Sequence, residues 1–298
     1  MRKLLLQIDS APHPSVFDRV VAFDAGADEV MSYGGVTPDA VRDLVHGCIF
    51  TRGPQDLKNT AIFIGGTDMA VGEAILDTVK KTFFGPMRVS VMLDSNGSNT
   101  TAVAAVMKIL QAVGGSVSGQ RIVITAGTGP VGTRAAGLLA KRGAEVHITS
   151  RRRQHAELAR QAILERFGGD VHADCLGESG SSAASLDGAR VLLNCGPVGV
   201  QLIPRSAWAN RAGLELAVDL NAVPPAGIEG IRPTDDGSVR DGVRCIGALG
   251  VGNLKMKIHK ACIARLFEVN DAVLDAEQIF ELQGMGSEVS GSPSRSSQ

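Results

Sequence analysis

The sequence is poor in aromatic residues and has no long apolar run. Aromatic side chains make up 4% of the 298 residues, with one Trp and one Tyr, whereas Gly occurs 36 times. This composition is typical of an α/β protein whose strands end at glycines. No apolar run approaches the roughly 20 residues that a membrane-spanning helix needs, so we expect no membrane association.

Charge excess and cysteine pairing are also missing. The formal net charge is -1, which provides no basic surface field for nucleic acid, and we expect no nucleic-acid partner. The five cysteines are scattered without a C-x-x-C pair, and Asp9 follows the N-terminal leucines too soon for a secretory signal. These features predict reduced thiols in a cytoplasmic protein.

Motifs of metalloenzymes and serine hydrolases are absent as well. The six histidines are dispersed and show no H-E-x-x-H spacing, so we expect no metal. The stretch at residues 115–119 resembles a nucleophile elbow, but it precedes a predicted strand instead of following one. Hydrolase chemistry therefore has no support.

The most informative feature present is a glycine motif between a predicted strand (residues 121–126) and a predicted helix (residues 133–142). That placement is the one required of a dinucleotide-binding G-x-G-x-x-G. The predicted cofactor-binding residues of this motif are Gly127, Thr128, Gly129, Pro130, Val131 and Gly132. Glycines there permit a tight turn and let backbone N–H groups approach a pyrophosphate at the helix N-terminus. The alternative is a purely structural turn.

A second predicted strand, at residues 145–149, ends where NAD enzymes usually place an acidic residue. Ser150 stands there instead, followed by Arg151, Arg152 and Arg153. A carboxylate would repel a 2′-phosphate, whereas a hydroxyl and guanidinium groups can bind it. We therefore predict NADP as the cofactor, with weaker use of NAD. The alternative is that the arginines only form a solvated helix start.

Strands and helices alternate along the whole chain, which predicts an α/β fold with two domains. Strands are expected at residues 3–8, 29–32, 61–64, 88–93, 121–126, 145–149, 170–173, 190–194, 215–219 and 244–247, and helices at residues 15–25, 38–46, 69–83, 99–113, 254–267 and 276–282. The last six strands match the doubly wound parallel sheet of a Rossmann dinucleotide-binding domain.

The central position of the glycine motif sets the expected domain order. Residues 1–113 should form an α/β substrate domain, completed by C-terminal helices within residues 254–285, and residues 114–253 the Rossmann NADP-binding domain. The active site is expected between the two domains. The tail, residues 286–298, is rich in Ser and predicted to be disordered.

Three segments at predicted strand ends could line the active site. Residues 94–101 are polar and include Asp94, Asn96 and Asn99, whose donors and acceptors could bind a heterocycle. Helix capping by Ser98 or Asn99 is the alternative. Asn221 begins a rigid loop that could form a wall of the nicotinamide pocket, and Lys255 follows a glycine-rich corner.

Several blocks in order resemble the NADP-dependent methylene-tetrahydromethanopterin dehydrogenases of methylotrophs. They lie at residues 14–18, 63–66, 83–86, 94–102, 127–132 and 247–255. The resemblance spans residues 3–267. It implies hydride transfer from methylene-tetrahydromethanopterin to NADP within formaldehyde oxidation, with methylene-tetrahydrofolate as a further substrate in some members.

The resemblance also suggests roles for individual residues. Asp18 and Asp94 become candidate carboxylates near the pterin, Asn96 and Asn99 its hydrogen-bonding partners, and Lys255 matches the active-site lysine of the family. A homo-oligomer is implied, a trimer or a multiple of one. The sequence has Ser150-Arg151-Arg152 where related members often carry Gly-Arg-Lys, so the positive charge is kept.

Two other functions fit parts of the sequence. One is a tetrahydrofolate-specific methylene dehydrogenase, but bifunctional enzymes of that class use a Tyr and a Lys on one helix, and Tyr33 is the only tyrosine. The other is a non-catalytic NADP-binding sensor, for which an eroded substrate loop would be expected. The polar segment at residues 94–101 is intact.

Overall fold

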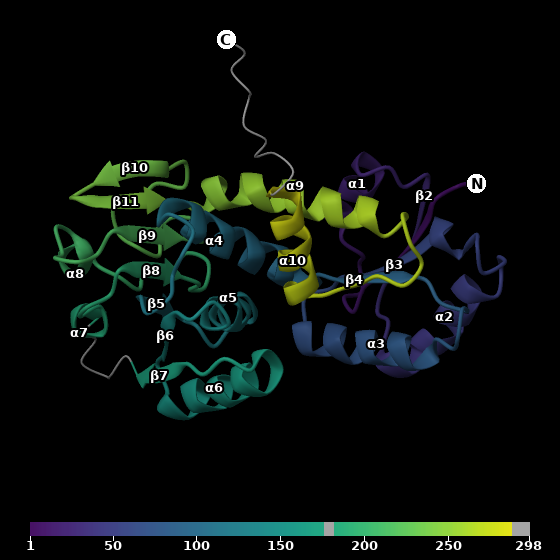
Figure 1. Cartoon of the computed structure of the whole chain (residues 1–298), viewed down its shortest axis with the longest axis horizontal. Coiled ribbons are helices and arrows are strands. Elements are labelled where there is room, and N and C mark those ends of the chain that lie inside the picture. The colour runs from purple at the N-terminus through teal and green to yellow at the C-terminus, as the bar shows by residue number, and fades with distance from the viewer. Residues whose placement is uncertain (176–181, 288–298) are drawn as a thin grey trace, which may run out of the picture. The chain divides into compact units, whose positions relative to one another are not determined.

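The structure, a computed structural model, describes residues 1–175 and 182–287 (Figure 1). It divides into two compact units. Unit 1 consists of Met1–Thr100 together with Lys257–Gln298, and unit 2 of Thr101–Met256. Each unit is an α/β layer structure built on its own sheet, and the predicted α/β class is confirmed.

Unit 1 is built on a five-stranded parallel sheet with strand order β12-β4-β3-β1-β2. Its strands are β1 (Leu4–Ile8), β2 (Glu29–Tyr33), β3 (Thr60–Ile64), β4 (Ser90–Leu93) and β12 (Val273–Leu274). Every residue of β3 and β4 is buried, as expected for parallel strands covered on both faces. β12 was not predicted, because two residues are too few to show a strand periodicity.

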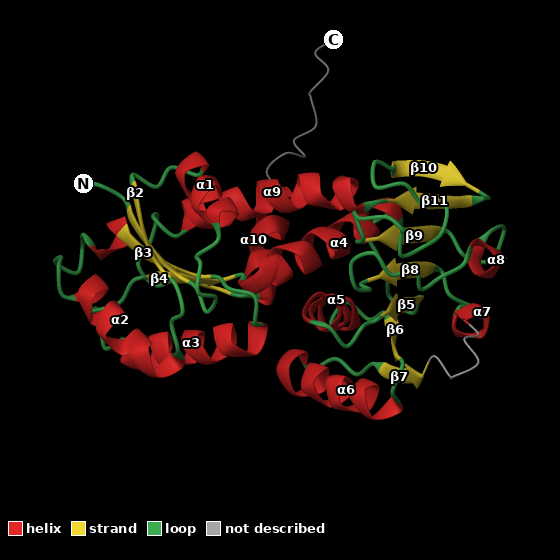
Figure 2. Cartoon of the chain, turned by 180° about the vertical axis from the view of Figure 1, so that it is seen from behind, coloured by secondary structure: helices red, strands yellow, loops and turns green. Residues whose placement is uncertain are grey.

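The helices of unit 1 cover both faces of this sheet, with α2 and α3 on one face and α1 on the other (Figure 2). Their bounds are α1 (Val16–Asp24), α2 (Val41–Ile49), α3 (Met69–Thr82) and α10 (Ala276–Ser287), with short 3-10 helices η1 (Pro38–Ala40), η2 (Leu57–Asn59) and η3 (Ser95–Gly97). Ser15 and Asp68 cap α1 and α3 by accepting backbone N–H bonds. Of the predicted disordered tail, residues 286–298, residues 286 and 287 belong to α10, and the rest lies outside the described residues.

Unit 2 is built on a seven-stranded sheet with strand order β10-β11-β9-β8-β5-β6-β7. The strands are β5 (Arg121–Thr125), β6 (Glu145–Ser150), β7 (His172–Cys175), β8 (Val191–Asn194), β9 (Leu216–Asp219), β10 (Asp236–Arg240) and β11 (Val243–Ile246). The six predicted strands are parallel and follow the Rossmann order 3-2-1-4-5-6 when β5 is taken as the first. The antiparallel edge strand β10 was missed, because its side chains are almost all exposed.

In unit 2, α5 and α6 lie on one face of the sheet and α7 and α8 on the other (Figure 1). The helices that contribute to this unit are α4 (Ser98–Ala112), α5 (Pro130–Ala140), α6 (Arg153–Phe167), α7 (Ser182–Ser185), α8 (Arg205–Trp208) and α9 (Ala248–Arg265). The prediction that α9 starts at residue 254 is wrong. A Cβ at Gly250 would lie 2.8 Å from the Asp235 carbonyl oxygen, so close packing explains a glycine within this helix.

None of the helices formed by residues 1–175 and 182–287 combines the length and the apolar character needed to cross a bilayer.

Candidate functional site

The glycine motif forms the turn between β5 and α5, and two of its glycines are required by packing. A Cβ at Gly132 would lie 2.7 Å from the Gly127 Cα, and a Cβ at Gly127 would lie 2.8 Å from the Ile148 Cβ. Real side chains do not fit at these distances. The first and third glycines therefore let α5 approach the turn and let the turn approach β6.

The middle glycine has space around it. A Cβ at Gly129 would meet only the Ala126 carbonyl oxygen, at 3.8 Å, and Gly129 occupies the N-cap position of α5. Thr128 and Val131 are half-buried on either side, and Pro130 is the first residue of the helix. The first N–H groups of a helix have no partner within it, and the helix dipole makes this end positive. This end of α5 can therefore receive a pyrophosphate.

The end of β6 lies directly beside this turn. The Gly127 N–H donates to the Thr149 carbonyl oxygen at 3.1 Å, and the next residue, Ser150, is buried with its Oγ accepting from the Arg152 N–H at 3.4 Å. Arg151 and Arg152 are exposed, and Arg152 is the N-cap residue of α6. Ser150, two exposed arginines and a helix N-terminus thus follow β6, where NAD enzymes usually place a carboxylate.

A buried polar network that the sequence analysis missed joins the ends of three strands. The Thr125 hydroxyl donates to Asn194 Oδ1 at 2.7 Å, and Asn194 Nδ2 donates to Asp219 Oδ1 at 2.8 Å. These residues end β5, β8 and β9, so the network fixes the strand ends around the glycine turn. The sequence offered one signal for this network, namely a polar residue at the end of each of three apolar strands.

Cys195 directly follows β8. Burial and, to a smaller degree, the charge of Asp219 raise the pKa of its thiol to about 12.

Asn221 serves the loop that it begins. It is 4% exposed; its Oδ1 accepts from the Val223 N–H at 3.1 Å and its Nδ2 donates to the Pro225 carbonyl oxygen at 3.2 Å. The loop contains a cis peptide bond between Pro224 and Pro225. The Asn221 side chain, which we predicted to bind the cofactor, therefore stabilises its own loop through hydrogen bonds to the loop backbone.

Lys255 is half-buried in α9. Because α9 starts at Ala248, Lys255 lies in its third turn and not just after a glycine-rich corner. Gly250 and Gly252, which belong to the predicted glycine-rich corner, lie within the helix. The helical hydrogen bonds of α9 therefore fix the backbone of Lys255.

Asp94 and Asn99, in unit 1, are buried and hydrogen-bonded to the protein. The Asp94 carboxylate accepts from the Thr100 N–H at 3.0 Å and from the Thr100 hydroxyl at 2.6 Å. Asn99 Nδ2 donates to the Leu93 carbonyl oxygen at 2.6 Å and to Asp275 Oδ1 at 2.9 Å. The polar segment forms η3 and the first turn of α4, and Asp94 caps this turn, where we had considered Ser98 or Asn99.

Asp18 and Asn96 lie around the turn that follows β3. A Cβ at Gly65 would lie 3.7 Å from Asp18 Oδ2, and the Asn96 N–H donates to the Gly66 carbonyl oxygen at 2.6 Å. Asn96 is exposed and has a left-handed backbone, with φ of 53°. The carboxyl ends of parallel strands are where α/β sheets bind ligands, and this turn places accessible polar groups at that end of the sheet of unit 1.

His259 was not singled out from the sequence. It is 0% exposed, its ring stacks on Phe63 with centroids 5.5 Å apart, and its Nδ1 lies 3.7 Å from Asp94 Oδ2. Because it lies far along the chain from Asp94, no local pattern could have revealed the pairing. It places an imidazole beside the buried carboxylate of unit 1.

Comparisons with known proteins point to one family. Residues 16–96 match the family model described as methylene-tetrahydromethanopterin dehydrogenase, N-terminal. In Methylorubrum extorquens, "Bifunctional protein MdtA" is 50% identical over 281 residues, covering 94% of this chain and 98% of that protein. The NAD(P)-dependent methylenetetrahydromethanopterin dehydrogenase of the same organism is 33% identical, covering 94% of this chain and 97% of its own.

A solved structure agrees at the level of the fold. Quinate dehydrogenase from Corynebacterium glutamicum, in complex with NAD, has a TM-score of 0.50 and 12% identity, and the match covers 95% of this chain and 99% of the other. Identity this low shows the shared fold alone. The sequence identity over nearly the full length carries the assignment, and the chain belongs to the methylene-tetrahydromethanopterin dehydrogenase family.

Proposed function

We propose that this protein oxidises methylene-tetrahydromethanopterin to the methenyl form by transferring a hydride to NADP. The observation that carries the cofactor assignment is the pairing of the Gly127 turn with Ser150 and two exposed arginines at the end of β6. The descriptions of the family model and of the 33% identical relative support the substrate class. Methylene-tetrahydrofolate, which carries a similar pterin edge, is the second candidate substrate.

In this proposal unit 2 binds the cofactor through backbone and cations. The N–H groups at the start of α5 bind the pyrophosphate, and Arg151 and Arg152 bind the 2′-phosphate with charge-assisted hydrogen bonds. The Asn221 loop is held rigid beside the strand ends. NADP, when bound, supplies the hydride acceptor.

The reaction itself needs positioning more than proton transfer. The carbon that loses the hydride lies between two nitrogens, whose lone pairs stabilise the resulting cation as an amidinium, so no proton has to be removed. The protein's part is to orient the methylene group and to stabilise positive charge. We assign the direct pterin contacts to Asp18 and Asn96, and a supporting role to the internally bonded Asp94 and Asn99.

Lys255 would oppose a developing cation if its ammonium group lay next to it. We therefore assign it to a pterin oxygen, away from the reacting carbon. On the half-buried face of α9 it can act as an orienting donor.

We further propose a cytoplasmic homo-oligomer. The five cysteines are all free thiols, as the reducing cytoplasm maintains them. Apolar side chains on α1, among them Val16, Val20 and Phe23, are exposed at helical spacing. An exposed apolar stripe of this kind is typical of an interface.

The test is an assay of purified protein with NADP and either methylene-tetrahydromethanopterin or methylene-tetrahydrofolate, following the absorbance of reduced nicotinamide. We expect turnover with the first substrate. Lys255→Ala should lower kcat strongly while leaving NADP affinity nearly unchanged, and Lys257→Ala, on the same helix and exposed, is the control. Failure of both substrates would contradict the proposal and favour a sensor.

A further inference from the structure

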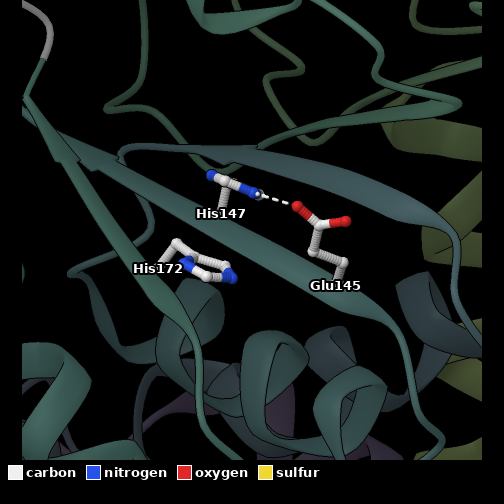
Figure 3. Close-up of side chains that lie close together, drawn as sticks. All are labelled: Glu145, His147 and His172. Carbon is white, nitrogen blue, oxygen red and sulfur yellow. Dashed lines mark hydrogen bonds and ion pairs between the residues drawn. The ribbon is translucent and has the colours of Figure 1, made fainter.

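Three metal-ligating side chains, Glu145, His147 and His172, gather on one face of the sheet of unit 2, on β6 and β7 (Figure 3), and Asp174 contacts His147. Glu145 and His147 alternate along β6, as do His172 and Asp174 along β7. His147 is paired with His172 in the parallel register, and Thr149 with Asp174. Alternate residues of a strand share a face, so the fold itself brings the four together. The hydride-transfer proposal uses none of them.

Three of these residues have ligand atoms close together, and the rings of His147 and His172 are stacked with centroids 4.5 Å apart. One atom each from Glu145, His147 and His172 lies within 4.8 Å of the others, and His147 Nε2 is 3.0 Å from Glu145 Oε1. Two ligands of a tetrahedral zinc ion with bonds of about 2.0–2.1 Å are about 3.4 Å apart. The His147–Glu145 pair is already close to that spacing. His172 is exposed, so its ring can turn to complete the set.

Asp174 fixes the orientation of the central imidazole. Its Oδ2 lies 2.8 Å from His147 Nδ1, which leaves Nε2 directed at Glu145. A carboxylate on the far nitrogen of a ligating histidine is the usual outer partner in zinc sites. With its proton on Nδ1, His147 would present a lone pair to the Glu145 carboxylate. That contact is favourable only if a cation lies between them or if the ring carries a second proton.

The charge and chemistry of the cluster select a type of metal. Arg121 is paired with Glu145 across β5 and β6 and offsets part of the negative charge, which disfavours hard cations that depend on carboxylates. Two imidazoles and one carboxylate suit borderline divalent ions instead. His147 is 7% exposed, whereas Glu145 and His172 face solvent, so an ion can enter from outside.

The three ligands lie before the end of β6 that meets the cofactor turn. At the usual strand rise, Ser150 is about 10 Å from His147 and about 16 Å from Glu145. The outer partner Asp174 lies nearer to the turn, since it is paired with Thr149.

We propose that Glu145, His147 and His172 form a binding site for a divalent transition-metal ion of the Zn²⁺ class, with Asp174 as the outer partner of His147. No metal was expected from the sequence, because the histidines lack the H-E-x-x-H spacing that places ligands one helical turn apart. Here the ligands come from two neighbouring strands.

The test is calorimetric titration of the full-length protein with Zn²⁺, after chelator treatment and removal of any polyhistidine tag. We expect one ion per chain. His172→Ala should weaken binding at least about ten-fold, and Asp174→Asn by about ten-fold, the usual effect of losing an outer partner. His155→Ala, which removes an exposed histidine outside the cluster, should bind like wild type.

Co²⁺ provides an independent readout, because its visible absorption reports coordination by histidine and carboxylate in a tetrahedral site. An intense band that is lost in His172→Ala and kept in His155→Ala supports the proposal. Absence of saturable Zn²⁺ binding, or equal affinity in wild type and His172→Ala, overturns it. Retained thermal stabilisation by NADP would show that His172→Ala is folded, because the cofactor turn lies at the other end of β6.

Discussion

At the scale of single residues, we propose that Arg151 and Arg152 set the choice between NADP and NAD. Replacing both by Ala should raise the KM for NADP by about ten-fold or more and leave the KM for NAD nearly unchanged. Hydrogen bonds to charged groups contribute about 1.5–3 kcal/mol, and only NADP carries the 2′-phosphate. Steady-state kinetics with both cofactors measure the ratio.

Arg153→Ala is the matched control for this pair, since Arg153 is equally exposed but lies inside α6. It should change the ratio little. If the double variant lost NAD and NADP to the same degree, the arginines would be acting through the fold and not through the phosphate.

The sequence was sufficient to predict residues whose role depends on near neighbours. Gly132 meets Gly127, five positions away, and Gly127 meets the end of the next strand, about twenty positions on, within one β-α-β unit. The structural role of Asn99 was harder to predict, because one of its hydrogen-bond partners, Asp275, is 176 positions away. The role of His259 beside Asp94 is hidden for the same reason.

At the scale of elements, an ion pair joins β10 to the loop before it. Asp235 accepts two bonds from the Arg240 guanidinium, both at 2.7 Å, and one from the Arg232 N–H. The hydrogen bond from Arg240 holds the pKa of Asp235 below the ordinary value of an aspartate. Asp235 also accepts the Gly247 N–H on its carbonyl oxygen, so the pair supports the start of α9.

Arg240→Ala should lower the free energy of unfolding by about 3 kcal/mol at neutral pH, because it leaves a buried carboxylate without its cation. Since the folded pKa is depressed, this stabilisation is present above about pH 4 and is lost as the pH falls through the folded value. Urea unfolding at pH 7 and near pH 3 should therefore show the difference from wild type shrinking in acid.

The Arg205–Asp241 pair nearby provides the comparison, because its arginine is 60% exposed. Arg205→Ala should cost about 1 kcal/mol or less at neutral pH. Equal losses from the two variants would contradict the argument from burial. Strand β10, which pairs with β11, was not predicted from the sequence, because an exposed edge strand lacks the apolar alternation that predicts strands.

At the scale of the whole molecule, the exposed stripe on α1 predicts self-association. Val20 is 53% exposed and Phe23 43%, and Met31 and Tyr33 on the edge strand β2 are also exposed. Val20→Glu should reduce the mass measured by light scattering, because a charge cannot be buried in an apolar contact. Leu158→Glu, at an exposed position on α6, should leave the mass unchanged. A monomeric wild-type protein would contradict the prediction.

The overall alternation of strands and helices was predictable because parallel sheets impose buried runs of fixed length. What the sequence concealed is that β12, near the C-terminus, joins the sheet of unit 1 beside β4. A strand of two residues can be identified only from its pairing with a neighbouring strand, because it is too short to show a pattern of its own.

This arrangement determines the order in which the two units can fold during synthesis. Unit 2 is continuous, so its residues have all left the ribosome while unit 1 still lacks its C-terminal part. Until Val273 and Leu274 emerge, β4 is an unpaired edge of apolar residues. The nascent chain therefore passes through a stage in which its Rossmann unit can fold and its N-terminal sheet remains open. Chaperone binding at that stage should centre on the N-terminal hundred residues, although they were made first.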